Sequence, residues 1–318
     1  MPMRYNKLGD SGLLVSELSF GSWVTFQNDG QLSEAEACLA LMKEAYLGGV
    51  NFFDNAEAYG AGDAETLMGE AIRLGIEQEI WDREDLVVST KLFNGTAAKW
   101  RDTAIQVNRV GTSRKHLWEG LRASLKRMQL EYVDLVFCHR PDPATPMEEV
   151  VRSFNEMINL RMCLYWGTSE WSAEQIRDAC AIADSLGLIG PVMEQPQYNL
   201  FHRQRVEVEY ARLYPRIGLT VWSPIAGGVL TGKYTGGVIP EGSRYALPGR
   251  SPPASLLERA ALADKLLPLC DRLGCTMGQL ALAWTCVNPD VSTAIFGATS
   301  VEREWRPVRC LFIPMRMR

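Results

Sequence analysis

Features that would place the chain in a membrane or outside the cell are missing from this sequence. None of its apolar runs is long enough for a transmembrane helix, and residues 1–6 have no apolar stretch of the kind found in signal peptides. The net charge is −5 and the pI is near 5.5, so the chain offers no basic field to nucleic acid or anionic lipid. We expect a cytoplasmic protein that neither binds nucleic acid nor inserts directly into a membrane.

Patterns for metal binding and for a disulfide framework are also missing. The eight cysteines are scattered without a C-x-x-C pair, and the chain has only three histidines. Reduced core thiols and no metal site are therefore expected. Cys138 lies directly beside His139, but neighbouring residues of a strand point to opposite faces, which argues against a cysteine–histidine nucleophile.

A dinucleotide-binding G-x-G-x-x-G pattern is absent as well. The nearest match, residues 60–65, lacks the third glycine and follows the second predicted strand rather than the first, which argues against a doubly wound fold. Eight short apolar runs instead alternate with helical patterns, which predicts the α/β class and a (β/α)₈ TIM barrel. Residues 5–15 precede them as a predicted β-hairpin that plugs the barrel floor.

The predicted elements follow the switch from apolar runs to helical periodicity. At 318 residues and 47% hydrophobic, the chain 1–318 is expected to form a single barrel domain, with an atypical tail at 303–318. The predicted strands are 17–21, 50–53, 86–91, 133–139, 162–167, 191–195, 218–222 and 291–297. The predicted helices begin with a capping box at 33–36, run over 64–74 and 113–128, begin near 145 and 172, run over 256–273, and begin at 276.

Three successive predicted strands end on a titratable side chain. These are Asp54, Lys91 and His139, and Tyr59 follows five residues after the first. The C-terminal ends of the strands of a parallel barrel converge on one mouth, where the active sites of this fold lie. We therefore expect these four side chains to meet in space.

The four residue types together suit proton delivery to a carbonyl oxygen. The ammonium of Lys91 would lower the pKa of Tyr59 from its ordinary value of about 10, and Asp54 would keep Lys91 charged and oriented. A neutral imidazole at His139 would donate a hydrogen bond to a substrate oxygen or relay a proton. Such an arrangement stabilises the negative charge that develops on a carbonyl oxygen during reduction.

Each of these residues also has an ordinary structural interpretation. Asp54 alone could equally be a carboxylate at the start of a loop or at a helix N-cap. Lys91 alone could be a solvated strand end, and His139 alone could be a core histidine bonded to backbone. Their joint placement at three strand ends, with Tyr59 beside the first, favours catalysis over these three separate explanations.

The loop after the seventh predicted strand has features of a phosphate site. Residues 222–234 contain glycines that admit close approach of phosphates and a lysine, Lys233, that pairs with them. Arg244 adds a guanidinium suited to a phosphomonoester. After the eighth strand, Thr299 and Glu302 form a predicted capping box, where an anion would bind at a helix N-terminus.

Several ordered motifs lie at the strand ends and in the loops that follow them. They are residues 51–56 (NFFDNA), 89–91 (STK), 138–142 (CHRPD), 165–172 (YWGTSEWS), 194–199 (EQPQYN), 222–224 (WSP) and 232–234 (GKY). Together they resemble the aldo-keto reductase superfamily, and within it the branch of potassium-channel β subunits, and the likeness runs from about residue 4 to residue 300.

The resemblance implies NADPH-dependent reduction of aldehydes or ketones by a tetrad, with Tyr59 as the acid. It also implies a pocket that favours a small or aromatic carbonyl compound, and a possible homo-tetramer. The implied tetrad is Asp54, Tyr59, Lys91 and His139. The implied NADPH/NADP-binding residues are Ser22, Trp23, Asp54, Ser169, Glu170, Gln195, Trp222, Ser223, Pro224, Ile225, Ala226, Gly227, Gly228, Lys233, Arg244, Gly297 and Thr299. The implied substrate pocket is Trp23, Phe26, Tyr59 and His139.

Within that resemblance the chain departs from the pattern at two places. Animal channel subunits carry asparagine where His139 stands, so this chain is better equipped for turnover. Arg303, Arg306 and Pro307 occupy positions where the family has Gln, Glu and Asn for the adenine end, and proline inside a helix costs about 3 kcal/mol. The hypotheses are a carbonyl reductase, an NADPH-binding auxiliary subunit of a membrane channel with little turnover, or a cofactor-deficient product of the altered tail.

Overall fold

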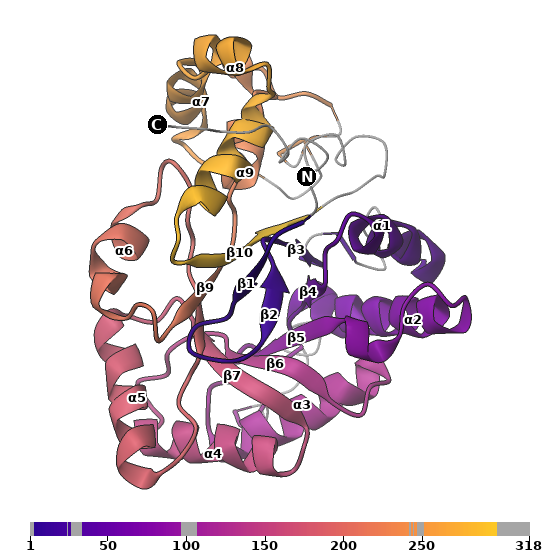
Figure 1. Cartoon of the computed structure of the whole chain (residues 1–318), viewed down its shortest axis with the longest axis vertical. Coiled ribbons are helices and arrows are strands. Elements are labelled where there is room, and N and C mark those ends of the chain that lie inside the picture. Colours follow the sequence, from indigo (N-terminus) through magenta and orange to yellow (C-terminus); the bar gives the residue numbers. More distant parts are fainter. Residues whose placement is uncertain are drawn as a thin grey trace.

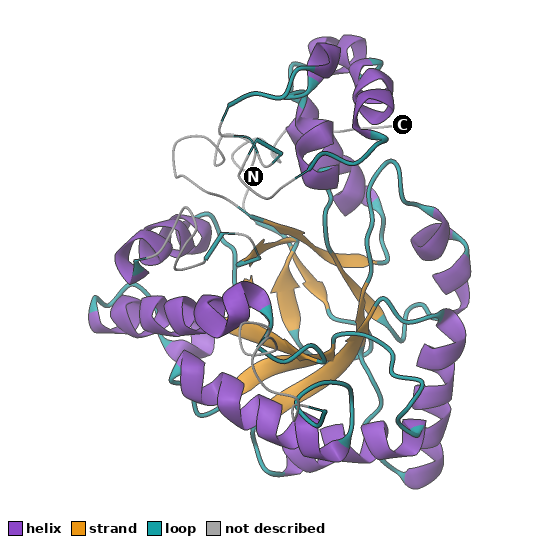
Figure 2. Ribbon diagram, turned by 180° about the vertical axis from the view of Figure 1, so that it is seen from behind, coloured by secondary structure: helices purple, strands orange, loops and turns teal. Residues whose placement is uncertain are grey.

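Eight parallel strands close into a barrel in the computed structural model of the chain (Figures 1 and 2). The structure describes residues 3–23, 25–26, 34–96, 107–241, 243, 245–246 and 251–297. The strand order around the barrel is β10-β3-β4-β5-β6-β7-β8-β9, and each strand pairs in parallel with both of its neighbours. The predicted (β/α)₈ TIM barrel is confirmed.

The elements alternate along the chain as the sequence predicts. The barrel strands are β3 (Leu18–Gly21), β4 (Phe52–Asp54), β5 (Val87–Leu92), β6 (Val133–Cys138), β7 (Cys163–Ser169), β8 (Met193–Gln195), β9 (Gly218–Val221) and β10 (Val291–Phe296). The α-helices are α1 (Ala35–Leu47), α2 (Asp63–Glu77), α3 (Arg114–Met128), α4 (Met147–Asn159), α5 (Ala173–Leu186), α6 (Gln204–Glu207), α7 (Leu256–Asp264), α8 (Leu267–Leu273) and α9 (Met277–Val287).

Barrel strands are buried on both faces, which explains their nearly continuous apolar sequences. Successive side chains alternate between the two faces: Phe52 and Val87 belong to the cluster inside the barrel, whereas Phe53 and Val88 belong to the layer beneath the helices. The alternation decides which polar side chains at the strand ends point into the barrel mouth.

The N-terminal hairpin, β1 (Tyr5–Lys7) and β2 (Leu14–Ser16), closes the barrel at the N-terminal ends of the strands, as predicted (Figure 1). Leu8 and Val15 are fully buried in the cluster inside the barrel. Gly9 has φ +57, and a Cβ there would lie 2.3 Å from the carbonyl oxygen of Val192, so only glycine fits this close approach.

Two helix starts match their predicted caps. Ser172 before α5 and Thr276 before α9 each form a capping box with the glutamine three residues later. α1 begins at Ala35 with Glu34 at the N-cap and no side-chain cap, and the predicted partner Ser33 lies outside the described residues.

The predicted helix over 256–273 was wrong, because the structure has two helices there, α7 and α8. Pro268 stands near the start of α8. A proline in a continuous helix would lack its hydrogen bond and clash with the carbonyl four residues earlier, so the helix breaks just before it.

The tail 303–318 and the predicted capping box of Thr299 with Glu302 lie outside the described residues. None of the helices that the structure describes combines the length and apolarity needed to cross a membrane.

Candidate active site

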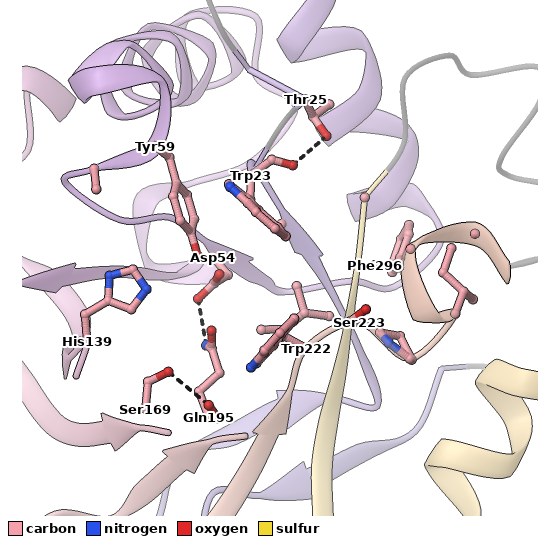
Figure 3. Close-up of a pocket in the computed structure, with 18 of the residues that line it drawn as sticks. Trp23, Thr25, Asp54, Tyr59, His139, Ser169, Gln195, Trp222, Ser223 and Phe296 are labelled. Carbon is pink, nitrogen blue, oxygen red and sulfur yellow. Dashed lines mark hydrogen bonds between the residues drawn. The ribbon is translucent and has the colours of Figure 1, made fainter. Parts of the chain in front are cut away.

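A cavity of about 470 Å³ opens at the C-terminal ends of the strands (Figure 3). Its described lining residues form two groups by position in the chain, called its two halves below: those up to Gln195, which include Tyr59 and His139, and those from Trp222 onward, which include the loop after β9. The described residues of the first half are Gly21, Trp23, Thr25, Asp54, Ala58, Tyr59, Asn94, His139, Arg140, Ser169 and Gln195. The second half is lined by Trp222, Ser223, Pro224, Ile225, Gly227, Gly228, Lys233, Ser243, Ile295, Phe296 and Gly297.

Lys91 and Asp54 form a buried ion pair in the first half. The Lys91 ammonium donates to Asp54 Oδ2 at 2.6 Å and to the Asn55 carbonyl oxygen at 2.7 Å, and the two charged side chains are 0% and 3% exposed. Burial alone would lower the pKa of Lys91, but the negative charge of Asp54 and the neighbouring Tyr59 outweigh burial and raise it. The lysine is therefore charged at neutral pH.

Tyr59 begins the short 3₁₀ turn η1 (Tyr59–Gly62), which brings its ring over Lys91. The ammonium donates to the phenolic oxygen at 3.1 Å and lies 4.7 Å from the ring centroid. The predicted direction of the pKa shift was wrong: burial raises the pKa of Tyr59 above its ordinary value, and Lys91 offsets this only in part. Asp54 neutralises much of the ammonium's effect, because its own charge opposes ionisation of the phenol.

His139 follows the last residue of β6, and its ring lies 6.0 Å from that of Tyr59, nearly perpendicular to it. Burial, then the positive charges of Lys91 and Arg140, hold the pKa of His139 well below 6.5, which agrees with the predicted neutral imidazole. Cys138 points to the opposite face, into the layer beneath the helices, and burial raises the pKa of its thiol well above the usual value. A cysteine–histidine nucleophile is therefore not formed here.

Two further side chains hold the Asp54 carboxylate. The Gln195 amide nitrogen donates to Asp54 Oδ1 at 3.1 Å (Figure 3). Ser89 donates to the same oxygen at 2.9 Å. Ser89 is not among the predicted site residues, although its position two residues before Lys91 places it on the same face of β5. Ser169 donates in turn to the Gln195 carbonyl oxygen at 2.9 Å.

The two aromatic residues predicted for the substrate pocket have different surroundings. Trp23 lines the cavity with its ring 6.3 Å from Tyr59 and 6.5 Å from Trp222. Phe26 does not line it: the side chain is fully buried, with its ring 5.9 Å from Phe20 in the core. Phe26 is thus a core aromatic residue, and its amide donates to the Ser22 carbonyl oxygen at 3.1 Å, which directs the side chain toward Phe20.

The residues predicted to hold a nucleotide are mostly brought together. Three of them do not line the cavity: Ser22 donates to the Asp54 carbonyl oxygen, Ala226 is buried in a hydrophobic cluster that the loop shares with α7, α8 and α9, and Glu170 accepts a hydrogen bond from the Trp222 indole at 2.9 Å. Arg244 and Thr299 lie outside the described residues.

Sequence reasoning missed several residues that line the cavity, among them Asn94 and Arg140. Asn94 lies two residues beyond β5 and Arg140 two beyond β6, so their proximity to strand ends was the available signal. Strand periodicity does not say which loop side chains turn toward the mouth.

Comparison with known proteins agrees with this geometry. The sequence pattern of the Aldo/keto reductase family matches residues 17–306. A protein of Oryza sativa subsp. japonica named "Probable voltage-gated potassium channel subunit beta" is 51% identical over 306 residues, covering 93% of this chain and 88% of that protein. A protein of Arabidopsis thaliana with the same name is 50% identical over the same length and shares of the two chains. The chain therefore belongs to the aldo/keto reductase family and is similar to members named as potassium channel β subunits.

Proposed function

We propose that this protein reduces aldehydes and ketones with NADPH as the hydride donor and Tyr59 as the general acid. The observation that carries the proposal is the single ammonium of Lys91 bonded to both Asp54 and Tyr59 at the cavity, beside a neutral His139. The membership of the aldo/keto reductase family supports the same reaction class.

The protein side chains supply the proton and stabilise the phenolate that remains when the proton leaves. Tyr59 is protonated at neutral pH and presents its hydroxyl to the carbonyl oxygen of a substrate. As that proton leaves, the charged Lys91 stabilises the phenolate, and Asp54 keeps the ammonium in position. His139 contributes a neutral imidazole, which donates a hydrogen bond to the same oxygen without carrying a charge of its own.

The residues of the cavity fit a nicotinamide dinucleotide phosphate. His139 Nδ1 and Ser243 Oγ are buried polar atoms of the lining without a hydrogen-bond partner among the described residues, so a ligand with polar groups would satisfy them. When bound, NADPH supplies a hydride to the carbonyl carbon. Ser169 and Gln195 would hold the carboxamide, Trp222 the nicotinamide face, residues 223–228 the pyrophosphate, and Lys233 with Arg244 the 2′-phosphate.

The proposal is tested by mixing the purified protein with NADPH and a panel of small aliphatic and aromatic aldehydes. We expect loss of the reduced-nicotinamide absorbance with formation of the matching alcohol, and loss of both in Tyr59→Phe. Tyr165→Phe, a substitution of a half-buried tyrosine on β7 that does not line the cavity, is the matched control. Equal rates in the wild type and Tyr59→Phe would show that Tyr59 is not the general acid.

The names of the relatives favour a second candidate function. Both similar proteins are named as potassium channel β subunits, so this chain is also a candidate for a cytoplasmic auxiliary subunit that binds NADPH, assembles as a homo-tetramer and docks on a membrane channel with little turnover. Affinity capture from detergent-solubilised membranes with NADPH bound tests it. Recovery of a channel subunit together with negligible aldehyde reduction would favour this function over the first.

A further inference from the structure

Arg140 is a cation at the cavity and has no charged partner among the residues that the structure describes. Its Nη1 donates to two neutral acceptors, the His139 carbonyl oxygen and Ser169 Oγ, the latter at 3.2 Å. No ion pair within the described part of the chain includes Arg140. By contrast, the partly buried Arg83 and Arg127 bond to carboxylates at 2.8 and 2.6 Å. Arg140 therefore has charge and hydrogen-bonding capacity that the described protein groups do not use.

The guanidinium leaves one complete edge for a ligand. Nη1 makes the two hydrogen bonds, so the Nε and Nη2 donors have no acceptor among the residues that the structure describes. These two nitrogens form the edge that binds a carboxylate with two parallel hydrogen bonds. The Ser169 and His139 contacts hold the side chain in place, which lowers the entropy that a ligand must otherwise overcome.

Among the charged residues of the cavity, Arg140 is the one that acts on Tyr59 and His139 without a carboxylate partner in the described part of the chain. The charged side chains among the described lining residues are Asp54, Arg140 and Lys233. Asp54 is neutralised by Lys91, and Lys233 lies against Gly228 in the loop after β9, in the second half of the cavity. Arg140 is close enough to Tyr59 and His139 for its charge to lower the pKa of both, after the larger effects of burial and Lys91. Its field therefore extends over the position where the carbonyl group would be protonated.

We propose that Arg140 is a specificity-determining residue that selects carbonyl substrates carrying a carboxylate group. The inference rests on the proposed carbonyl reduction and narrows it to a substrate class: aldehydes whose carbonyl carbon lies at the Tyr59 end while the acid group pairs with the Nε–Nη2 edge. Apart from Asp54, which is paired with Lys91, the other described lining residues of this half are uncharged, so none of them offers an anion a second free cation.

Pairs of substrates that differ only in charge test the proposal. Succinic semialdehyde and 4-carboxybenzaldehyde are each compared with their methyl esters at saturating NADPH, in the wild type, Arg140→Gln and Arg140→Lys. We expect the wild type to have the higher kcat/KM for each acid. Because a hydrogen bond to a charged group contributes about 10- to 100-fold to binding, Arg140→Gln should lower the acid-to-ester ratio by about that factor. The acid-to-ester ratio of Arg140→Lys should fall between those of the wild type and Arg140→Gln, since an ammonium keeps the charge but not the planar edge.

If Arg140 served only to orient Ser169, its substitution would lower kcat/KM for the acid and for the ester equally. The acid-to-ester ratio would then stay unchanged. The ratio therefore separates substrate selection from a purely positioning role of Arg140. Arg152→Gln, on the exposed face of α4, is the control for the loss of a positive charge far from the cavity, and its ratio should match that of the wild type. An unchanged ratio in Arg140→Gln would overturn the inference and leave carbonyl reduction intact.

Binding without turnover separates this inference from the proposed function. Titration calorimetry of 4-carboxybenzaldehyde and its methyl ester into the protein saturated with NADP⁺ measures selection in the absence of a hydride donor. Tighter binding of the acid in the wild type, lost in Arg140→Gln, would support the inference even if no aldehyde were reduced, a result that would contradict the proposed function alone. Equal binding of acid and ester in the wild type would overturn the inference.

Discussion

At the scale of single residues, the site depends on Lys91, which is fully buried and bonds to both Asp54 and Tyr59. Removal of one partner of a buried ion pair leaves an uncompensated charge, at a cost of about 3–5 kcal/mol. We expect Lys91→Met to lower the free energy of unfolding by about this amount, measured by urea unfolding at pH 7. The double variant Asp54→Asn/Lys91→Met should recover part of the loss. A Lys91→Met protein as stable as the wild type would contradict the account of the pair.

The protonation states of Tyr59 and His139 predict the pH dependence of reduction. The acid must be protonated, and burial raises the pKa of Tyr59 above about 10, so the acid form persists through neutral and mildly alkaline pH. The pKa of His139 lies well below 6.5, so the imidazole stays neutral over the same range. We expect kcat/KM for NADPH-dependent reduction to be flat from about pH 7 to 9 and to fall only above about 10.

A decline of kcat/KM between pH 7 and 8 would instead indicate a tyrosine pKa lowered by Lys91. The sequence alone favours that lowered value, because it shows which charges lie near Tyr59 but not how deeply the phenol is buried.

By contrast, alternation along β4, β5 and β6 placed Asp54, Lys91 and His139 correctly. It could not place loop side chains: Phe26 lies in the core, and Arg140 turns toward the cavity.

At the scale of elements, the helix that follows Tyr59 is held against its neighbour by a glycine. A Cβ at Gly69 of α2 would lie 2.1 Å from the Met128 carbonyl oxygen at the end of α3, so neither backbone can accommodate it without a shift. We expect Gly69→Ala to lower the free energy of unfolding by about 1–3 kcal/mol, measured by urea denaturation.

Gly12→Ala is the matched control, since nothing lies within 4 Å of its added Cβ and its φ is not positive, and it should be nearly neutral. Because η1 leads directly into α2, Gly69→Ala should also reduce turnover through displacement of Tyr59. Equal stability of the two variants would contradict the tight contact between α2 and α3.

Element types could be predicted well from the sequence, and element ends less so. Buried strands and capping boxes such as that of Ser172 have local signals. The break between α7 and α8 at Pro268 also had a local signal, but the apolar periodicity on both sides favoured one helix. The closing of the barrel floor by Leu8 depends on contacts distant in sequence, yet the hairpin pattern was sufficient to predict it.

At the scale of the whole molecule, the cavity joins the first barrel strand to the last. Its lining extends from Gly21 on β3 to Phe296 on β10, so a ligand bound there should stabilise the closed barrel. Saturation at 100 times the dissociation constant adds about 2.7 kcal/mol to the free energy of unfolding. We expect NADPH to raise the melting temperature by a few degrees, and NADH to raise it less because it lacks the 2′-phosphate.

Lys233→Met should reduce the rise in melting temperature caused by NADPH toward the rise caused by NADH. Lys126→Met, on the exposed face of α3, should leave the rise with NADPH unchanged. Differential scanning fluorimetry with matched nucleotide concentrations measures all of these shifts. Identical shifts with NADPH and NADH in the wild type would show that the loop after β9 does not recognise the 2′-phosphate.

The rate of a single turnover tests the central claim most directly, because it separates proton delivery from nucleotide binding. Wild type and Tyr59→Phe are each saturated with NADPH, binding is verified by nucleotide fluorescence, and one aldehyde is added in a stopped-flow instrument. General acid catalysis contributes about 10²- to 10⁴-fold, so we predict that Tyr59→Phe binds NADPH normally but oxidises it at least about 100 times more slowly. Oxidation at the wild-type rate by Tyr59→Phe with bound NADPH would contradict the account.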